Sequence, residues 1–169
     1  NAPPEFNSSG GLTVSQITDS ADANWGKVSI VYSIRDPDTS SGTANPGFAT
    51  PSFEYNIGGG WVAIPSNRLS SNALDNKAVE GTNYSSYTAY WDAATQIPTT
   101  YYATAQVRAT INDNEAANNT ATSTSSNFAL DTKVPVVSAW KIDKTTDTLT
   151  LTSTDDTVLQ YRISNNLDM

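Results

Sequence analysis

Acidic and amide side chains are the main candidates for chemistry in this sequence, because it contains no cysteine and no histidine. Those two absences exclude disulfides and cysteine nucleophiles, and they remove the commonest general base and the commonest transition-metal ligand. The acidic and amide residues form three clusters: Asp36 with Asp38, Asp113 with Asn114 and Glu115, and Asp155 with Asp156.

Clusters of this type have two interpretations. Their carboxylate and carbonyl oxygens suit Ca²⁺, although none of the three has the spacing of an EF-hand. Alternatively, Asp and Asn side chains accept hydrogen bonds from nearby backbone in turns. The turn interpretation is favoured, so we expect no metal site and no cofactor. No pair of carboxylates stands out for glycoside hydrolysis, and we expect that the protein is not an enzyme.

Three tripeptides match the acceptor pattern for an N-linked glycan, at Asn7, Asn83 and Asn118. All three fall in expected loops or strand ends, where a glycan would reach solvent. A chain rich in Asn, Ser and Thr also produces this pattern by chance, so occupied and bare sites both remain open.

Aromatic side chains offer a further possibility, a platform for sugars. Trp91 alternates with Tyr87 along one expected strand, which indicates a place in the core. Trp61 follows a run of three glycines and is the better surface candidate, and Trp25 lies in a polar turn.

Composition excludes several classes of partner. The net charge is −8 and the pI is about 4.2, so nucleic acid and anionic membranes would be repelled. No apolar run approaches the ~18 residues of a membrane span, and we expect no membrane insertion. Only 15% of the residues are charged, and the polar residues are mainly Ser, Thr and Asn, which favours an extracellular or cell-surface location. A sequence that starts at Asn1 predicts a processed or fragmentary chain.

The elements that must position these residues are β-strands. Apolar residues recur at every second position from Tyr101 to Ile111, the period of a half-buried strand. The same period predicts seven strands and no helix, an all-β sandwich over 12–132, preceded by an extended segment at 1–11. The expected strands cover 12–17, 27–35, 53–57, 61–64, 87–91, 101–111 and a last strand that ends at Leu130, with a short edge strand near 78–79. The core positions that this register predicts are Val28, Ile30, Tyr32, Ile34, Phe53, Tyr55, Val107, Ile111 and Phe128.

A second alternation begins after Pro135. Val137, Ala139 and Trp140 begin it, Leu149 and Leu151 continue it, and Tyr161 and Ile163 end it. These match three strands, so we expect residues 133–169 to form a second, incomplete sandwich.

Several segments resemble a known class of repeat. The stretches GKVSIVYSIRDPD, GGGW, YWDAATQIP, AQVRATINDNEAANN and FALDT look like the immunoglobulin-like, fibronectin type III-like tandem repeats of bacterial secreted and cell-surface proteins. The later stretch TLTLTSTDDTVLQYRISNN resembles the opening half of another such repeat. The resemblance implies a tandem arrangement and a secreted or surface location, and it implies no catalytic residues.

Three strands of a sandwich would leave an apolar face and open edges. We therefore expect a structural subunit of an extracellular filament or surface fibre, assembled head-to-tail from copies of one chain. The expected donor is the segment around Phe6, and the expected acceptor residues are Leu149, Leu151, Tyr161 and Ile163. The alternative is a non-catalytic adhesive or carbohydrate-binding module of a larger secreted protein.

Overall fold

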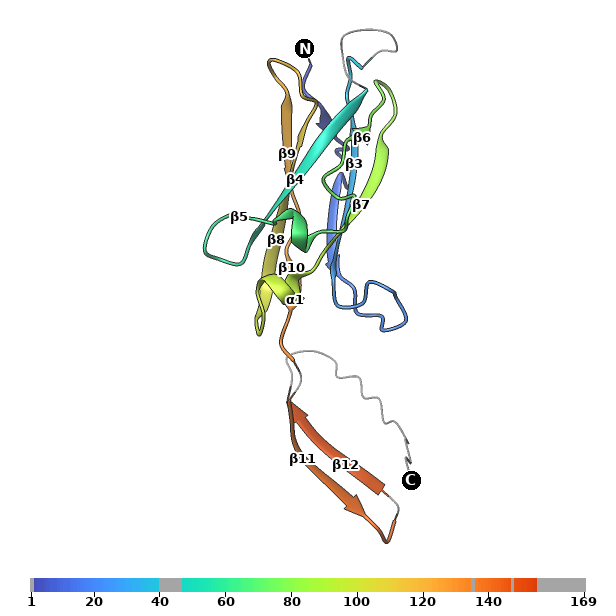
Figure 1. The fold of residues 1–169 in the computed structure, drawn as a ribbon, viewed down its shortest axis with the longest axis vertical. Coiled ribbons are helices and arrows are strands. Elements are labelled where there is room, and N and C mark those ends of the chain that lie inside the picture. Colours follow the sequence, from blue (N-terminus) through green and yellow to red (C-terminus); the bar gives the residue numbers. More distant parts are fainter. Residues whose placement is uncertain (1, 40–46, 135, 147, 155–169) are drawn as a thin grey trace. The chain divides into compact units, whose positions relative to one another are not determined.

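The computed structural model describes residues 2–39, 47–134, 136–146 and 148–154, and the regular secondary structure of these residues is almost wholly antiparallel β-strand (Figure 1). The chain divides into two compact units, residues 1–132 and 133–169. The N-terminal segment belongs to the first of them.

One sheet of the first unit is organised around the central strand β3 (Val28–Arg35). On one side β3 pairs with β1 (Glu5–Phe6) and then with β2 (Leu12–Gln16), and on the other side it pairs with β7 (Ser85–Trp91). β1 and β2 thus pair with successive parts of the same edge of β3. Residues 1–11, expected to be a free extended segment, are part of this sheet through Glu5 and Phe6.

The other sheet of the first unit is built on two long strands, β4 (Phe48–Asn56) and β8 (Tyr101–Asn112). The outer side of β8 pairs with β9 (Thr120–Thr124) and β10 (Phe128–Asp131). The outer side of β4 pairs with the short strands β5 (Val62–Ala63) and β6 (Lys77–Ala78).

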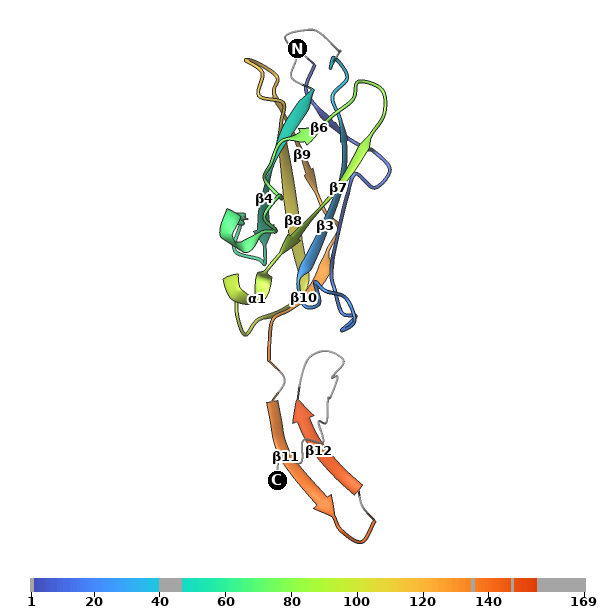
Figure 2. The ribbon, with the colours of Figure 1, turned by 45° about the vertical axis from the view of Figure 1, so that its right-hand side comes forward.

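The two sheets pack face to face around a single apolar core (Figure 2). Tyr32 of β3 meets Phe53 of β4 edge-to-face, with 5.5 Å between ring centroids. Trp91 of β7 stacks on Tyr55 of β4 at 5.0 Å. Contacts of this type between the inner faces fix the register of both sheets, because a slip of one residue would turn every side chain to the opposite face.

The predicted core is confirmed at eight of its nine positions. Val31, between two buried neighbours of β3, is 38% exposed, which shows that the register of this strand is as expected. Phe128 packs against the core but stays partly exposed. The eight buried residues are Val28, Ile30, Tyr32, Ile34, Phe53, Tyr55, Val107 and Ile111.

The expectation that the first unit contains no helix was wrong in detail. A single helical turn, α1 (Ala93–Gln96), follows β7, and a 3₁₀ turn covers Ser66–Arg68. The cause of α1 is local: the Asp92 carboxylate accepts a hydrogen bond from the Thr95 N–H at 3.2 Å and from the Thr95 hydroxyl at 2.6 Å. This is an N-cap, which satisfies a backbone donor that the first turn leaves free.

The last expected strand, which ends at Leu130, corresponds to β10, and a separate strand, β9, precedes it. Residues 125–127 separate the two. The N–H of Ser125 donates to the Val107 carbonyl at 2.9 Å, and its hydroxyl accepts from the Val107 N–H at 3.0 Å. These two bonds keep the main chain of Val107 paired between the end of β9 and the start of β10. A second irregularity follows in β10, where the pairing with β8 shifts register between Phe128 and Leu130.

The described part of the second unit is a β-hairpin of β11 (Val136–Asp143) and β12 (Thr148–Thr154). The register pairs Trp140 with Leu151 and Ile142 with Leu149. The third strand expected around Tyr161 and Ile163 lies outside the described residues.

Ile30 offers the most direct test of the core. Replacing Ile30 with Ala removes buried methyl groups from the centre of β3 and should lower the free energy of unfolding by about 2–5 kcal/mol. The matched control is Val31→Ala on the outer face of the same strand, which should cost well under half as much. Urea unfolding of the three proteins measures both effects. Equal losses for the two variants would contradict the assigned register.

Candidate functional site

The strongest candidate for an interaction surface is one face of the β11–β12 hairpin. Opposed residues of an antiparallel pair share a face, so Ile142 and Leu149 lie on the same side of the hairpin, and Trp140, two positions from Ile142 in β11, lies on that side too. The pair between them, Lys141 and Thr150, lies on the other side. One face of the hairpin is therefore apolar and the other polar; we call the first the hairpin face.

The hairpin face is open to solvent. Trp140 is 69% exposed and Ile142 is 55% exposed, and Leu149 is also exposed. An isolated two-stranded hairpin is only marginally stable in water, and it needs a further strand or sheet over its apolar side. Among the expected acceptor residues the structure brings Leu149 and Leu151 into one hairpin, while Tyr161 and Ile163 lie outside the described residues. Trp140 and Ile142 were not singled out from the sequence as acceptors, because the alternation was assigned through Val137 and Ala139. The register shift between these two residues places Trp140 opposite Leu151 and Ile142 opposite Leu149.

Phe6, the expected donor, is held within its own unit. It pairs with Ile34 across β1 and β3 and packs against the core. The adjacent Glu5 accepts two hydrogen bonds from the Arg35 guanidinium, at 2.9 Å and 2.8 Å. As a donor to another copy, the segment would first have to leave these contacts.

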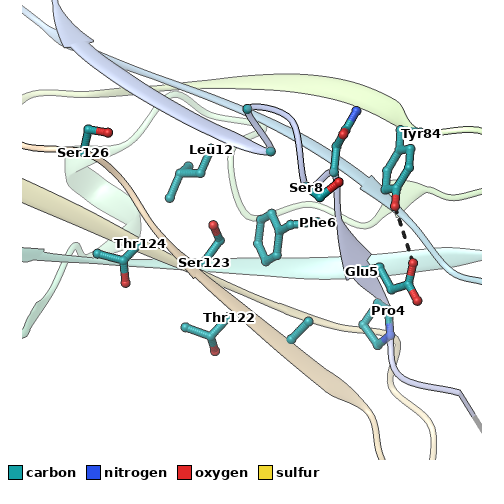
Figure 3. A pocket seen from close by; sticks show the side chains of 14 residues that line it. Pro4, Glu5, Phe6, Ser8, Leu12, Tyr84, Thr122, Ser123, Thr124 and Ser126 are labelled. Atoms are coloured by element: carbon teal, nitrogen blue, oxygen red, sulfur yellow. Dashed lines mark hydrogen bonds between the residues drawn. The ribbon is translucent and has the colours of Figure 1, made fainter.

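A groove of about 710 Å³ runs beside Phe6, between the β1–β2 segment and β9 (Figure 3). Phe6 and Leu12 supply its apolar side chains, and Ser123 of β9 turns its hydroxyl toward them. The hydroxyls of Thr122 and Thr124 turn to the other side of β9, where that of Thr122 lies 3.1 Å from the Thr110 hydroxyl. Tyr84 donates a hydrogen bond to Glu5 at 3.4 Å at one end of the groove.

The groove lies where the two sheets separate along one flank of the first unit. Farther along the same flank, Gln16 of β2 closes the gap to β10: its amide donates to the Asp131 carbonyl at 2.6 Å and accepts from the Asp131 N–H at 2.8 Å. Beside β1 and β9 no equivalent bridge is found in the described residues. An extended segment laid along this groove could pair with an open strand edge.

The three expected glycan acceptors differ in access. Asn83 and Asn118 are exposed, and Asn118 has a φ of 51°, which places it in a turn. Asn7 is half-buried, and its side-chain carbonyl accepts a hydrogen bond from the Ser9 N–H at 3.0 Å. Asn83 and Asn118 are therefore the more accessible acceptors.

The structure brings together two of the three acidic clusters. Asp36 and Asp38 follow β3, and Asp113 and Glu115 follow β8, in loops that meet at one end of the first unit. Sequence reasoning kept these clusters apart, because more than 70 residues separate them and only the facing of the two sheets brings them together. The third cluster, Asp155 and Asp156, lies outside the described residues.

The turn interpretation describes part of this acidic group. The Asp113 carboxylate accepts a local turn bond from the Glu115 N–H at 2.9 Å. The Asp38 carboxylate instead accepts from the N–H of Ala2, 36 residues away in the chain, at 2.7 Å. Asp36 differs, because it is 0% exposed and neither of its carboxylate oxygens has a hydrogen-bond partner in the described part of the chain.

Burial raises the pKa of Asp36 to about 6, and the neighbouring carboxyl groups of Asp38 and Asp113 contribute to the rise. The Thr39 hydroxyl opposes this rise in pKa, but its geometry falls short of a hydrogen bond. Burial, with Asp38 and Asp113 nearby, also raises the pKa of Glu115. In contrast, the Ala2 N–H holds the pKa of Asp38 below its ordinary value.

The three tryptophans of the first unit differ in their exposure to solvent. Trp91 is fully buried, as its alternation with Tyr87 indicated. Trp61 is half-buried, with the Arg108 guanidinium 4.6 Å from its ring centroid. Trp25 is 59% exposed, in the turn before β3.

Comparison with protein-family models, with curated proteins and with solved structures found no match for this chain. Within the described residues, no helix has the length and apolar character needed to cross a membrane.

The pKa of Asp36 predicts how stability depends on pH. Its value in the folded protein, about 6, lies above the ~3.9 of an unfolded chain. The protonated form therefore favours folding, and this contribution is lost as the pH rises through 6. In metal-free buffer the first unit should be about 1 kcal/mol more stable at pH 5.0 than at pH 7.5. Urea unfolding at the two pH values measures the difference.

The matched variant for the pH prediction is Asp36→Asn, which cannot ionise. Glu115 contributes in the same direction, so the pH response should shrink in the variant without vanishing. A response of the same size in Asp36→Asn would show that Asp36 is not its source.

The exposure of the three asparagine acceptors predicts which of them would carry a glycan. In material from a host that performs N-glycosylation, intact-mass analysis should show added hexose-containing mass, and peptide mapping should place it on Asn83 or Asn118 ahead of Asn7. Asn83→Gln and Asn118→Gln should each remove one increment. A native mass equal to that of the bare polypeptide would rule the modification out.

Proposed function

We propose that this protein is a non-catalytic structural subunit that assembles with other copies of itself, head-to-tail, into an extracellular filament or surface fibre. The observation that carries the proposal is the exposed hairpin face: Trp140, Ile142 and Leu149 project from a two-stranded sheet. A hairpin of this kind becomes stable when another chain covers it.

Covering the apolar side chains of this face contributes free energy that favours association. Burying one large apolar side chain contributes about 1.5–3 kcal/mol, so two of them contribute roughly 3–6 kcal/mol before the cost of ordering. Main-chain hydrogen bonds along an added strand would fix direction and register. The gain is modest for a single contact, which suits an assembly in which each subunit makes contacts at both ends.

The partner surface that fits best is the groove between β1 and β9 of another copy. It offers apolar side chains from Phe6 and Leu12 beside the open flank of a sheet. The hairpin face and the groove are different surfaces, so the contact is heterologous, and repetition of such a contact gives a filament unless the rotation closes a ring. In this arrangement Phe6 lines the acceptor groove while it remains in its own sheet.

The architecture also supports an immunoglobulin-like module in a tandem array. The first unit has two facing antiparallel sheets, with β3 and β7 in one and β4, β8, β9 and β10 in the other, and the second unit begins directly after Thr132. This arrangement, the low charged fraction of 15% and the surface rich in Ser, Thr and Asn favour an extracellular or cell-surface location.

The second candidate function is a non-catalytic adhesive or carbohydrate-binding module of a larger secreted protein. Trp25 favours it, because a tryptophan that is 59% exposed is available to stack on a sugar ring. Under this function the protein stays monomeric, and Trp25→Ala abolishes binding to a glycan array without changing the oligomeric state.

The assembly proposal predicts opposite results for two neighbouring residues of β11. Ile142→Ser removes an apolar side chain from the hairpin face and should lower the average mass measured by light scattering to that of a monomer. Lys141→Ser, on the polar face of the same strand, should leave assembly within about twofold of the unmodified chain, since a surface substitution of this kind changes free energies by about 0.5 kcal/mol or less. An unmodified chain that remains monomeric at millimolar concentration would refute the proposal.

A further inference from the structure

The acidic group at the end of the first unit contains a buried charge that the fold leaves without a partner. The main chain of Asp36 is fully engaged: its N–H donates to the Glu80 carbonyl at 3.1 Å, and its carbonyl accepts from the Thr39 N–H at 3.2 Å. The turn is thus formed by backbone, and the side chain takes no part in it. Both carboxylate oxygens nevertheless point into the protein, shielded from solvent and without hydrogen bonds.

An arrangement of this kind needs an explanation, because buried charges in proteins are paired, protonated or bound to a metal ion. The residue that precedes Asp36 in the chain, Arg35, is basic, but its guanidinium forms a salt bridge with the Glu5 carboxylate at 2.8 Å. The charged groups of the described residues that act on Asp36 are Asp38 and Asp113, both acidic, and Asp38 lies close enough to share a proton with it. The positive charge of the amino terminus acts on Asp38 and Glu115 in the direction that lowers their pKa values, whereas the acidic neighbours raise that of Asp36.

Two more buried oxygens in the same place also lack partners. The Thr39 hydroxyl and one carboxylate oxygen of Glu115 have no hydrogen bond in the described part of the chain. With Asp36 they form a set of oxygen donors from two loops, the one that follows β3 and the one that follows β8. An unsatisfied donor set made of carboxylates and a hydroxyl fits a hard cation.

The lack of a preformed carboxylate cage in the described residues favours a cation that accepts flexible coordination. Within the described residues, no three acidic side chains are already arranged around a single ion position. Binding would therefore use fewer carboxylates, completed by hydroxyl, backbone carbonyl and water oxygens, or would draw the two loops together. Ca²⁺ accepts six to eight such oxygens in flexible geometry, at about 2.3–2.6 Å, whereas Mg²⁺ requires a near-ideal octahedron.

We propose that Asp36, together with Asp38, Thr39, Asp113 and Glu115, forms a Ca²⁺ site that ties the loop after β3 to the loop after β8. The ion neutralises the buried Asp36 carboxylate and links the two sheets at this end of the first unit. The site is independent of the hairpin face, so binding of Ca²⁺ and self-assembly can succeed or fail separately.

The test compares the unmodified chain of 169 residues with two variants after treatment with EDTA and removal of the chelator. Asp36→Asn removes the buried charge, and Asp75→Asn removes an exposed carboxylate of the same unit as a matched control. Calorimetric titration with CaCl₂ measures binding, and the unfolding temperature is measured in EGTA, in CaCl₂ and in MgCl₂.

For the unmodified chain and for Asp75→Asn, we expect saturable binding of one Ca²⁺ and a rise in Tm of roughly 5 °C or more at Ca²⁺ concentrations far above Kd. MgCl₂ should have a much smaller effect. Asp36→Asn should lose at least tenfold in affinity. In EGTA it should unfold at the same temperature as the unmodified chain or a higher one, because an amide is less costly to bury than an unpaired charge.

Two results would overturn the proposal: no binding to the unmodified chain up to about 10 mM, beyond the millimolar range of weak extracellular sites, or equal affinity in Asp36→Asn and Asp75→Asn. An equal response to Mg²⁺ and Ca²⁺ would indicate general charge screening and would also overturn it. If Asp36→Asn does not fold, Glu115→Gln replaces it, with the same loss of affinity expected.

Discussion

An apolar face of a β-sheet must be covered, and most of this structure follows from that requirement. In the first unit β3 and β7 bring Ile30, Tyr32 and Trp91 to one inner face, and β4 and β8 supply the opposite face with Phe53 and Val107. Each sheet covers the other, so both registers are fixed together. In the second unit the same alternation leaves Trp140 and Ile142 exposed on the hairpin face. The account of function rests on this contrast between a satisfied and an unsatisfied sheet.

Sequence periodicity was sufficient to predict the strands and their register where one face of a strand is buried. It placed the register of β3 and β8 correctly, because alternating burial is a property of the strand itself. It began β4 too late, at Phe53, because the Ser-, Gly- and Pro-rich stretch up to Pro51 indicated a loop. In the structure Pro51 pairs with Ile111 on one side, and on the other side it falls between the stretches of β4 that pair with β6 and β5. A proline is tolerated where the ladder is interrupted.

Other features depended on contacts that the sequence does not display. The helical turn α1 forms through the cap between Asp92 and Thr95, a signal of four residues that was present but too short for a periodicity argument. The approach of Asp36 to Asp113 depends on how two sheets face each other, which no local pattern encodes. The exposed state of Trp140 likewise could not be predicted, because alternation marks a face as apolar without saying what covers it.

The central claim is that the hairpin of the second unit is stable only when another copy covers it. Hydrogen exchange followed by mass spectrometry, at low and at high protein concentration, tests this directly on peptides that contain β11 and β12. The account predicts rapid exchange in both strands at low concentration and strong protection at high concentration, while β3 and β8 stay protected throughout. Equal protection of β11 and β12 at the two concentrations would contradict it, since the hairpin would then be covered by its own chain.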